Sequence, residues 1–226
     1  MKVYGNFING KFVKPYSKKY LNVLNPYTEK VIAKVPDSNK KDVDSAVNSA
    51  RKAFDSGSWS DMTLGERSNI LFKLADLIQK NLLSIAKLES INQGKTIKMA
   101  RDSDIPFAID NLRFFAGASR SMKDVTPQEY IDYHEKTKHK PLGTSMIKRE
   151  PIGVIASITP WNYPFMIAIW KIGPALAMGN AVVIKPASTT PLTTLELGML
   201  AKKAGIPDGV LNVITGSGSV VGSYLA

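Results

Sequence analysis

Apolar and polar residues follow one another in a regular order in the last third of the chain. Two short apolar runs, at 154–158 and 181–184, each have the length of one buried strand. Between them, Pro164 suits the first turn of a helix because its φ is fixed and it lacks an N–H, and Gly179 with Asn180 ends that helix. This order predicts a strand, a helix and a second, parallel strand, which together form one crossover unit.

A polar cluster follows each of these two runs. Thr159–Asn162 comes directly after the first predicted strand, and Lys185–Ser188 comes after the second. Ligands bind at the carboxyl ends of parallel strands, and these ends meet at one edge of a sheet. The two clusters are therefore expected to form one site.

Strand patterns also occur at both ends of the chain. Residues 3–35 read as strands with a hairpin turn at Asn9 and Gly10, and residues 210–214 form a third apolar strand. Because a doubly wound sheet normally has five or six strands, the predicted fold is α/β with an incomplete doubly wound parallel sheet and an N-terminal β-hairpin. The third apolar strand is expected to leave an open apolar edge.

Apolar residues with helical spacing fill much of the remaining sequence. The first helix is expected to be capped by Asp37 or Ser38, and the second by a capping box formed by Thr63 and Glu66. The expected helices cover residues 43–54, 64–83, 85–91, 105–122 and 191–204, and another begins after residue 216.

Residues 126–150 break this order because they are polar and irregular. Short extended pieces are expected at 129–133 and 144–149. A polar hairpin of this kind buries little surface, so we expect it to pair with another element, such as a second subunit. The chain is therefore divided into residues 1–125, 126–150 and 151–226.

Composition and charge narrow the classes of protein that fit. The 226 residues are 44% apolar, which suits a packed core, and the absence of a run of about 18 apolar residues predicts no membrane span. The first residues lack the apolar centre of a signal peptide, so a cytoplasmic location is expected. The net charge of +11 comes from scattered lysines, and the densest run, at 136–140, has no interleaved aromatic rings, so no nucleic-acid partner is expected.

The chain contains no cysteine, which excludes disulfides, thiolate metal sites and a cysteine nucleophile within these residues. Its two histidines, His134 and His139, lie in the lysine-rich run and have the pattern of surface residues rather than a catalytic pair or metal ligands. No metal site is predicted.

Several motifs together resemble the signature of the aldehyde dehydrogenase superfamily. They are PWNYP from Pro160, WKIGPALA from Trp170, GN at Gly179, KP at Lys185, TPL from Thr190, AGIPDGVLNV from Ala204, and the N-terminal pieces FINGKFV, LNP and DVDSAV. The resemblance covers essentially the whole chain. The glycine pattern at 216, 218 and 222 is weaker, since it is one residue longer than G-x-G-x-x-G and follows a third strand.

The resemblance implies the N-terminal half of such an enzyme, similar to betaine aldehyde or aminobutyraldehyde dehydrogenases. Residues 1–125 and 151–226 would belong to a domain that binds NAD or NADP, and residues 126–150 to a small β arm for oligomerisation. The implied reaction oxidises a small aldehyde to its carboxylate through thiohemiacetal formation, hydride transfer and hydrolysis. The implied partners are further copies of the chain or a complementing C-terminal half.

Three parts of the family's machinery have no counterpart in this sequence. They are the nucleophilic cysteine, the Glu-Leu-Gly-Gly stretch with its general base, and the Phe-Thr-Gly-Ser loop. The isolated chain is therefore expected to be inactive. The alternatives are a non-catalytic nucleotide-binding or assembly module, a basic nucleic-acid binder, and a truncated product or one half of a split gene.

The resemblance also implies roles for two residues just before the predicted helix that begins at Pro164 and for two residues within it. Asn162 matches an asparagine whose amide stabilises the oxyanion formed when a thiolate attacks the aldehyde, with a helix cap before Pro164 as the alternative. Lys171 matches a lysine that relays charge, as a buried side chain near a carboxylate. Tyr163 and Trp170 match aromatic residues that line a tunnel for cationic aldehydes, with a core aromatic pair as the alternative.

The cofactor-binding positions implied by the resemblance lie in the two polar clusters and at two glycines. Lys185 matches a lysine that donates to the adenosine ribose hydroxyls, with an ordinary exposed lysine as the alternative. Ser188 stands where many NAD-preferring relatives carry glutamate, so tolerance of NADP is expected. Gly218 and Gly222 match glycines near the adenine end of the cofactor, with turn formation as the alternative. The full set is Thr159, Pro160, Trp161, Asn162, Lys185, Pro186, Ala187, Ser188, Gly218 and Gly222.

Overall fold

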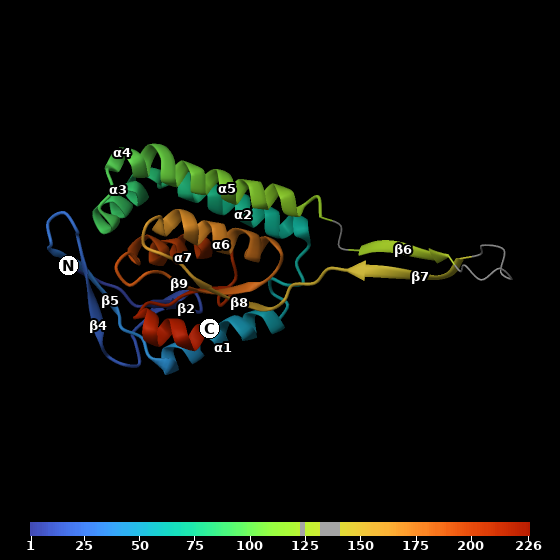
Figure 1. The fold of residues 1–226 in the computed structure, drawn as a ribbon, viewed down its shortest axis with the longest axis horizontal. Coiled ribbons are helices and arrows are strands. Elements are labelled where there is room, and N and C mark those ends of the chain that lie inside the picture. The colour runs from blue at the N-terminus through green and yellow to red at the C-terminus, as the bar shows by residue number, and fades with distance from the viewer. Residues whose placement is uncertain (123–124, 132–140) are drawn as a thin grey trace.

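The computed structural model describes residues 1–122, 125–131 and 141–226, with the backbone alone for 125–131 and 141–147. Figure 1 shows a layered α/β body from which one two-stranded ribbon projects. The lysine-rich run with His134 and His139 lies outside the described residues.

The order of elements follows the sequence pattern closely. The described strands are β1 (Lys2–Val3), β2 (Asn6–Ile8), β3 (Lys11–Val13), β4 (Tyr20–Leu24), β5 (Val31–Pro36), β6 (Val125–Ile131), β7 (Pro141–Lys148), β8 (Val154–Ile158), β9 (Ala181–Lys185) and β10 (Leu211–Val213). The described helices are α1 (Lys40–Asp55), α2 (Leu64–Lys80), α3 (Leu82–Gln93), α4 (Ile97–Met99), η1 (Ala100–Asp104), α5 (Ile105–Ser119), α6 (Pro164–Ala177), α7 (Leu192–Ala204), η2 (Gly218–Gly222) and α8 (Ser223–Leu225).

A mixed sheet in the order β3-β2-β10-β9-β8 lies at the centre of the body. β8, β9 and β10 run parallel, as the crossover pattern predicted. Along β9, Val182 and Ile184 enter the larger core cluster, whereas Ala181 and Val183 enter the smaller one. Both faces of β9 are therefore buried, which explains its continuous apolar run.

Helices cover both faces of this sheet (Figure 1). α6 and α7, which are the two crossovers, pack on one face, and α2 and α5 form a further layer over them. α1 packs on the other face and contacts α8. None of the helices in the described part of the chain is long and apolar enough to cross a bilayer.

The N-terminal hairpin covers the edge that was expected to stay open. β2 pairs antiparallel with β10 through Phe7 and Val213. Next to this pair, the buried side chain of Asn6 accepts the N–H of Thr215 at 3.0 Å and donates to Ser38 Oγ at 2.8 Å. The expectation of an open edge on the third apolar strand was wrong, because the polar Asn6 supplies contacts to a segment 209 residues away in sequence.

Two tight turns and a smaller sheet complete the N-terminal region. Asn9 and Gly10 have φ values of 51° and 71°, as the predicted hairpin turn between β2 and β3 requires. β1, β5 and β4 form a separate three-stranded sheet in that order. This small sheet brings Leu24 of β4 to the groove described below.

Several helix boundaries differ from those expected. Asn39, rather than Asp37 or Ser38, caps α1 with a capping box to Asp42, since the Ser38 hydroxyl is engaged by Asn6. The predicted capping box of Thr63 and Glu66 at α2 is confirmed. The helix expected over 64–83 ends at Lys80 and α3 begins at Leu82, and the helix expected to reach residue 122 ends at Ser119.

β6 and β7 form the projecting ribbon (Figure 1). They pair antiparallel from Val125 with Lys148 to Ile131 with Pro141, so the extended pieces lie earlier than expected. Among the described strands, neither pairs with any strand other than its hairpin partner. Residues 132–133 of the first expected piece lie outside the described residues.

Candidate functional site

The two predicted polar clusters lie at the same edge of the central sheet. β8 and β9 pair in parallel with Ile158 opposite Lys185, so each strand ends at the same level. The first residue beyond β8, Thr159, donates its backbone N–H to the carbonyl of Lys185 at 3.0 Å. The loops 159–163 and 186–191 therefore leave the sheet side by side.

Lys185 is buried at the end of β9, with only 3% of its surface exposed. Its Nζ donates to the carbonyl of Pro186 at 3.1 Å, and burial lowers the pKa of its ammonium group. An ordinary exposed lysine was the alternative interpretation, and it is wrong. An amine with one carbonyl partner keeps further N–H donors for a ligand at this edge.

Asn162 lies in the loop between β8 and α6, and it is exposed. The N-cap of α6 is Tyr163, and no side chain makes a cap hydrogen bond there, so the helix-cap interpretation of Asn162 is wrong. The backbone carbonyl of Asn162 accepts from Lys95 Nζ at 3.2 Å. Its carboxamide makes no hydrogen bond within the described part of the chain and is free to donate to a ligand.

The turn after β10 leaves space where the resemblance implies a cofactor. Neither Gly218 nor Gly222 has a positive φ, so turn formation does not require glycine at either position. A Cβ on Gly218 would meet nothing within 4 Å, and one on Gly222 would meet only Ile158, at 3.8 Å. Thr159 Oγ1 is also buried without a hydrogen-bond partner in the described residues. Open glycines at a helix start and an unpaired hydroxyl both fit a bound dinucleotide.

A groove of about 610 Å³ lies beside the ends of β8 and β9. It is lined by residues of β4, the end of α3 and both site loops, including Trp161 and Ser188. Trp161 is largely exposed, as is Pro160, whereas Pro186 is buried and Ala187 is partly buried. Of the predicted cofactor positions, Trp161 and Ser188, one from each loop, line this groove.

The two predicted tunnel aromatics do not contact each other. Tyr163 has the ammonium group of Lys95 4.6 Å from its ring centroid, and Trp170 packs edge-to-face on Phe107 of α5 at 6.0 Å. Trp170 remains 39% exposed, so the interpretation as a core aromatic pair is wrong. Lys171 is exposed rather than buried, and it forms no ion pair with the described carboxylates.

The sequence pattern missed the residues that hold the two loops in place. Glu89 and Asn92 of α3 are buried and continue the apolar face of Ile85 at helical spacing. Asn92 Nδ2 donates to the carbonyl of Thr189 at 3.0 Å, and its Oδ1 accepts the N–H of Leu192 at 3.1 Å. Polar residues on an otherwise apolar helix face are the signal that points to such contacts.

Glu89 links the starts of the two crossover helices. Its Oε1 accepts the N–H of Phe165 at 3.1 Å, and its Oε2 accepts the Thr193 hydroxyl at 2.7 Å. Burial raises the pKa of this carboxyl despite these two hydrogen bonds and the nearby charge of Lys95. A carboxylate at this position lies at the N-terminal end of α6, where it interacts favourably with the helix dipole.

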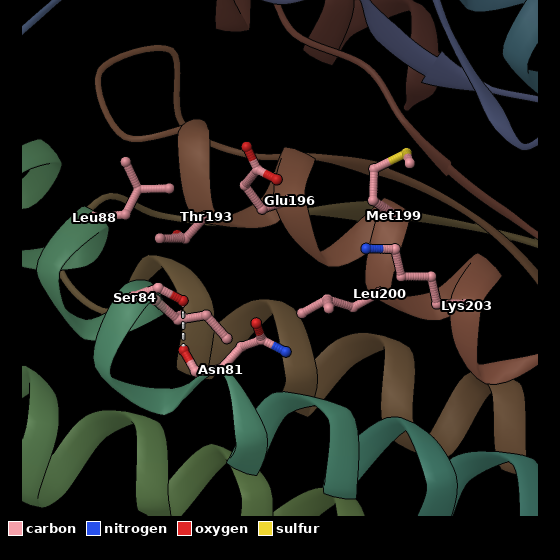
Figure 2. A pocket seen from close by; sticks show the side chains of 9 residues that line it. Asn81, Ser84, Leu88, Thr193, Glu196, Met199, Leu200 and Lys203 are labelled. Carbon is pink, nitrogen blue, oxygen red and sulfur yellow. Dashed lines mark hydrogen bonds between the residues drawn. The ribbon is translucent and has the colours of Figure 1, made fainter.

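A second hollow, of about 280 Å³, lies between α7 and the junction of α2 and α3. Figure 2 shows its apolar side chains Leu88, Leu200 and Met199 among the polar groups of Asn81, Ser84, Glu196 and Lys203. It shares no lining residue with the clusters 159–162 and 185–188, so it is separate from the edge site. In the described parts of the chain, no three histidine, aspartate or glutamate side chains converge as metal ligands would.

Comparisons with known proteins identify what this architecture resembles. A sequence model of the aldehyde dehydrogenase family matches residues 12–226. The mitochondrial aldehyde dehydrogenase of Leishmania tarentolae is 43% identical over 219 residues, which are 97% of this chain and 42% of the relative. The chain thus spans less than half the length of the curated relatives that it matches.

Solved structures share the fold over the same extent. An aldehyde dehydrogenase from Bacillus cereus in complex with NAD⁺ has a TM-score of 0.85 and 37% identity, covering 98% of this chain and 43% of its own. A point mutant of betaine aldehyde dehydrogenase from Staphylococcus aureus, also in complex with NAD⁺, has a TM-score of 0.87 and 35% identity over 98% of this chain and 43% of its own. These structures confirm the predicted fold class.

Replacing Glu89 with glutamine tests the effect of burial on this carboxyl. Because its pKa is raised, the folded state binds a proton more readily than the unfolded state, and stability is lost as pH rises through the raised pKa. The free energy of unfolding of the wild-type chain should fall relative to that of Glu89→Gln as pH rises above the ordinary range of a glutamate carboxyl, in urea denaturation.

Glu66→Gln is the matched control, because the hydrogen bonds from Thr63 lower the pKa of the exposed Glu66. The contribution of a carboxyl with a lowered pKa is lost only as pH falls below its unfolded value, so the effect of Glu66→Gln should be constant over the same range. A wild-type chain that gains stability relative to Glu89→Gln as pH rises would contradict the prediction.

Proposed function

Because the chain belongs to the aldehyde dehydrogenase family, we propose that it forms the cofactor-binding part of an enzyme that oxidises an aldehyde to its carboxylate. One observation carries this proposal. The free carboxamide of Asn162 and the buried amine of Lys185 follow two paired strands and lie at one edge of the sheet. At this edge, Asn162 would supply a donor for a developing charge and Lys185 a donor for a bound dinucleotide.

The residues around this edge are suited to a nicotinamide dinucleotide. When bound, such a cofactor accepts the hydride that the aldehyde carbon loses. Lys185 would donate to ribose hydroxyls, and Thr159 would supply its unpaired hydroxyl. Gly218 and Gly222 would allow close approach at the start of η2. The complex of the Bacillus cereus relative with NAD⁺ supports the class of cofactor.

Asn162 would act on the charge that forms during the reaction. An oxyanion appears when a thiolate adds to the aldehyde carbon, and an amide N–H already in place stabilises it without reorganisation. The chain itself contains no cysteine, so the thiolate must come from another polypeptide segment. Lys171 is the second proposed catalytic residue, as a cation exposed one position beyond Trp170.

The proposed substrates are cationic aldehydes such as betaine aldehyde or an aminoaldehyde. Tyr163 already holds the ammonium group of Lys95 over its ring, and Trp170 leaves part of its ring exposed. Ring faces attract quaternary ammonium groups in the same way. The likeness to betaine aldehyde dehydrogenase from Staphylococcus aureus supports this class of substrate.

Ser188 is proposed to make NADP acceptable as well as NAD. Its side chain lines the groove and carries no charge. A carboxylate at such a position would accept from the ribose 2′-hydroxyl of NAD and repel the 2′-phosphate of NADP. A serine removes that repulsion.

Residues 126–150 are proposed as an arm for assembly with further copies of the chain or with a complementing segment. The ribbon of β6 and β7 projects from the body (Figure 1), and a two-stranded ribbon alone has little stability in water. Residues 1–125 and 151–226 then form the cofactor domain. The alternative function is a non-catalytic nucleotide-binding module, which the lack of a cysteine favours.

Turnover with and without a thiol-bearing segment tests the proposed function. The 226 residues alone should give no aldehyde-dependent formation of NADH, measured by absorbance. Their complex with a complementing C-terminal half that carries the cysteine, here called the thiol-bearing segment, should form NADH. In that complex, Asn162→Ala should lower kcat by about 100- to 1,000-fold, because an oxyanion donor is lost. Asn48→Ala, on the exposed surface of α1, is the control. Aldehyde oxidation by the 226 residues alone would contradict the need for a separate thiol.

Trp170→Ala tests the substrate class in the same complex. Loss of one ring face should raise the KM for betaine aldehyde by about 2- to 30-fold, as expected for a cation–π contact. 3,3-Dimethylbutanal has the same shape with carbon in place of the charged nitrogen, so its KM should change less. Equal increases for the two substrates would show that the ring contributes shape rather than charge recognition.

Ser188→Glu tests the proposed tolerance of NADP by equilibrium titration of both cofactors. The introduced carboxylate should weaken NADP⁺ binding by about tenfold or more and leave NAD⁺ binding equal or stronger, because like charges repel at close range. Ser121→Glu is the control, since it places the same charge on an exposed residue just after α5 that does not line the groove. A wild-type chain that already rejects NADP⁺ would refute the proposal.

A further inference from the structure

Lys95 lies where three separate segments of the chain meet. It follows Gly94, whose φ of 92° ends α3. Its Nζ forms an ion pair with Asp104 of η1, donates to the carbonyl of Asn162 at 3.2 Å and lies 4.6 Å from the centroid of the Tyr163 ring. A single ammonium group thus contacts η1 and the loop between β8 and α6.

The ion pair is buried, which limits how far its members can move. The side chains of Lys95 and Asp104 expose 8% and 2% of their surface. The backbone of Lys95 is also held, because its carbonyl accepts the Ser90 hydroxyl at 2.7 Å and its N–H donates to Gln93 Oε1 at 2.9 Å. Desolvation of a charge is costly unless partners surround it, so the ammonium group has one favourable position.

The contacts of Lys95 are to the backbone and the neighbour of Asn162, not to its carboxamide. The carbonyl of Asn162 belongs to the peptide bond that joins it to Tyr163, and the ring of Tyr163 extends from the residue on the other end of that bond. The carboxamide itself makes no hydrogen bond within the described residues. The point from which this side chain extends is therefore determined by how the backbone at this peptide bond is held.

A second buried side chain holds the loop at its other end. The Glu89 carboxyl accepts the N–H of Phe165, three residues after Asn162, whose carbonyl accepts from Lys95. The acidic side chain thus contacts a backbone donor, and the ammonium group contacts a backbone acceptor. Both come from α3 or the residues directly after it.

We infer that Lys95, paired with Asp104, is a positioning residue that holds the backbone of Asn162 where its carboxamide can reach the reacting carbonyl oxygen. This inference rests on the proposed function. Lys95 touches neither substrate nor cofactor. It acts through the backbone of Asn162 and the ring of Tyr163, which gives the amide donor a fixed origin before the oxyanion forms. The same contacts would serve a purely structural role if they stabilised only the fold, and the experiments below separate the two.

The first experiment measures local hydrogen exchange in the 226-residue chain. Lys95→Met alone would leave the buried Asp104 carboxylate unpaired and destabilise the whole fold, so the test variant combines Lys95→Met with Asp104→Asn. The matched control combines Lys98→Met with Asp102→Asn, which makes the same changes on exposed residues of the same segment. Lys95→Arg keeps the charge and tests rescue.

The measured quantity is the exchange rate of residues 160–167 relative to that of α2 in the same sample. In the test variant this ratio should rise by about tenfold to 100-fold, the range for losing a hydrogen bond to a charged group. It should stay at the wild-type value in the control and rise less in Lys95→Arg. An unchanged ratio, including an equal rise of both rates from global destabilisation, would overturn the inference.

The second experiment is a double-mutant cycle on kcat in the complex with the thiol-bearing segment. The Lys95→Met and Asp104→Asn pair should lower kcat by about tenfold or more with little change in the KM for the aldehyde, because it misplaces a group used in the transition state. In the Asn162→Ala background the same pair should change kcat by less than about twofold. A purely structural pair would lower kcat equally in both backgrounds, which would overturn the positioning role.

The outcomes also separate this inference from the proposed function. If Asn162→Ala alone leaves kcat unchanged, the oxyanion role fails and Lys95 positions no catalytic group, whatever the exchange ratio shows. If Asn162→Ala lowers kcat and the effect of the Lys95 pair persists in full without Asn162, the proposed function stands and the positioning role of Lys95 fails.

Discussion

The parallel pairing of β8 and β9 is the constraint on which the rest of the site depends. Ile158 lies opposite Lys185, so the residues that follow both strands begin at one level of the sheet. A shift of one residue would turn every side chain of a strand to the opposite face and separate the two loops. The backbone hydrogen bond from the N–H of Thr159 to the carbonyl of Lys185 continues the observed register beyond the end of β8.

The loops beyond these strands are held by α3 rather than by the sheet. Backbone groups in a loop lack the partners that a ladder provides, and buried ones must find others. Glu89, Asn92 and Lys95 supply these partners from one helix end, to Phe165, to Thr189 and Leu192, and to Asn162. The loop side chains of Asn162 and Trp161 are thus left exposed, with their backbone already held. A site with free donors on a fixed backbone is suited to binding a ligand with little reorganisation.

The N-terminal residues contribute to the same architecture from the far side of the sheet. β2 pairs with β10, and the Asn6 side chain links Thr215, which follows β10, to Ser38, which precedes the N-cap of α1. Residues from both ends of the chain therefore stabilise one sheet. The loop that follows β10 carries glycines at 216, 218 and 222. Only Gly216 has a positive φ, and a Cβ there would meet Ser38 at 3.0 Å. Gly218 and Gly222 carry no such constraint, so the space beside them is available to a ligand.

Local pattern determined the elements, their order and the shared edge of the two polar clusters. Apolar runs, the capping box of Thr63 and Glu66, and Gly94 mark segment types because each signal depends on residues a few positions apart. Parallel crossovers leave only one place for the ends of successive strands. The family resemblance in PWNYP and the motifs after it likewise needed no coordinates. Tertiary structure alone decided that β2 covers β10, that Phe107 rather than Tyr163 packs on Trp170, and that Lys95 holds the backbone of Asn162. These contacts join residues that lie far apart in sequence, and their energy comes from burial and charge pairing that exist only after the layers have packed.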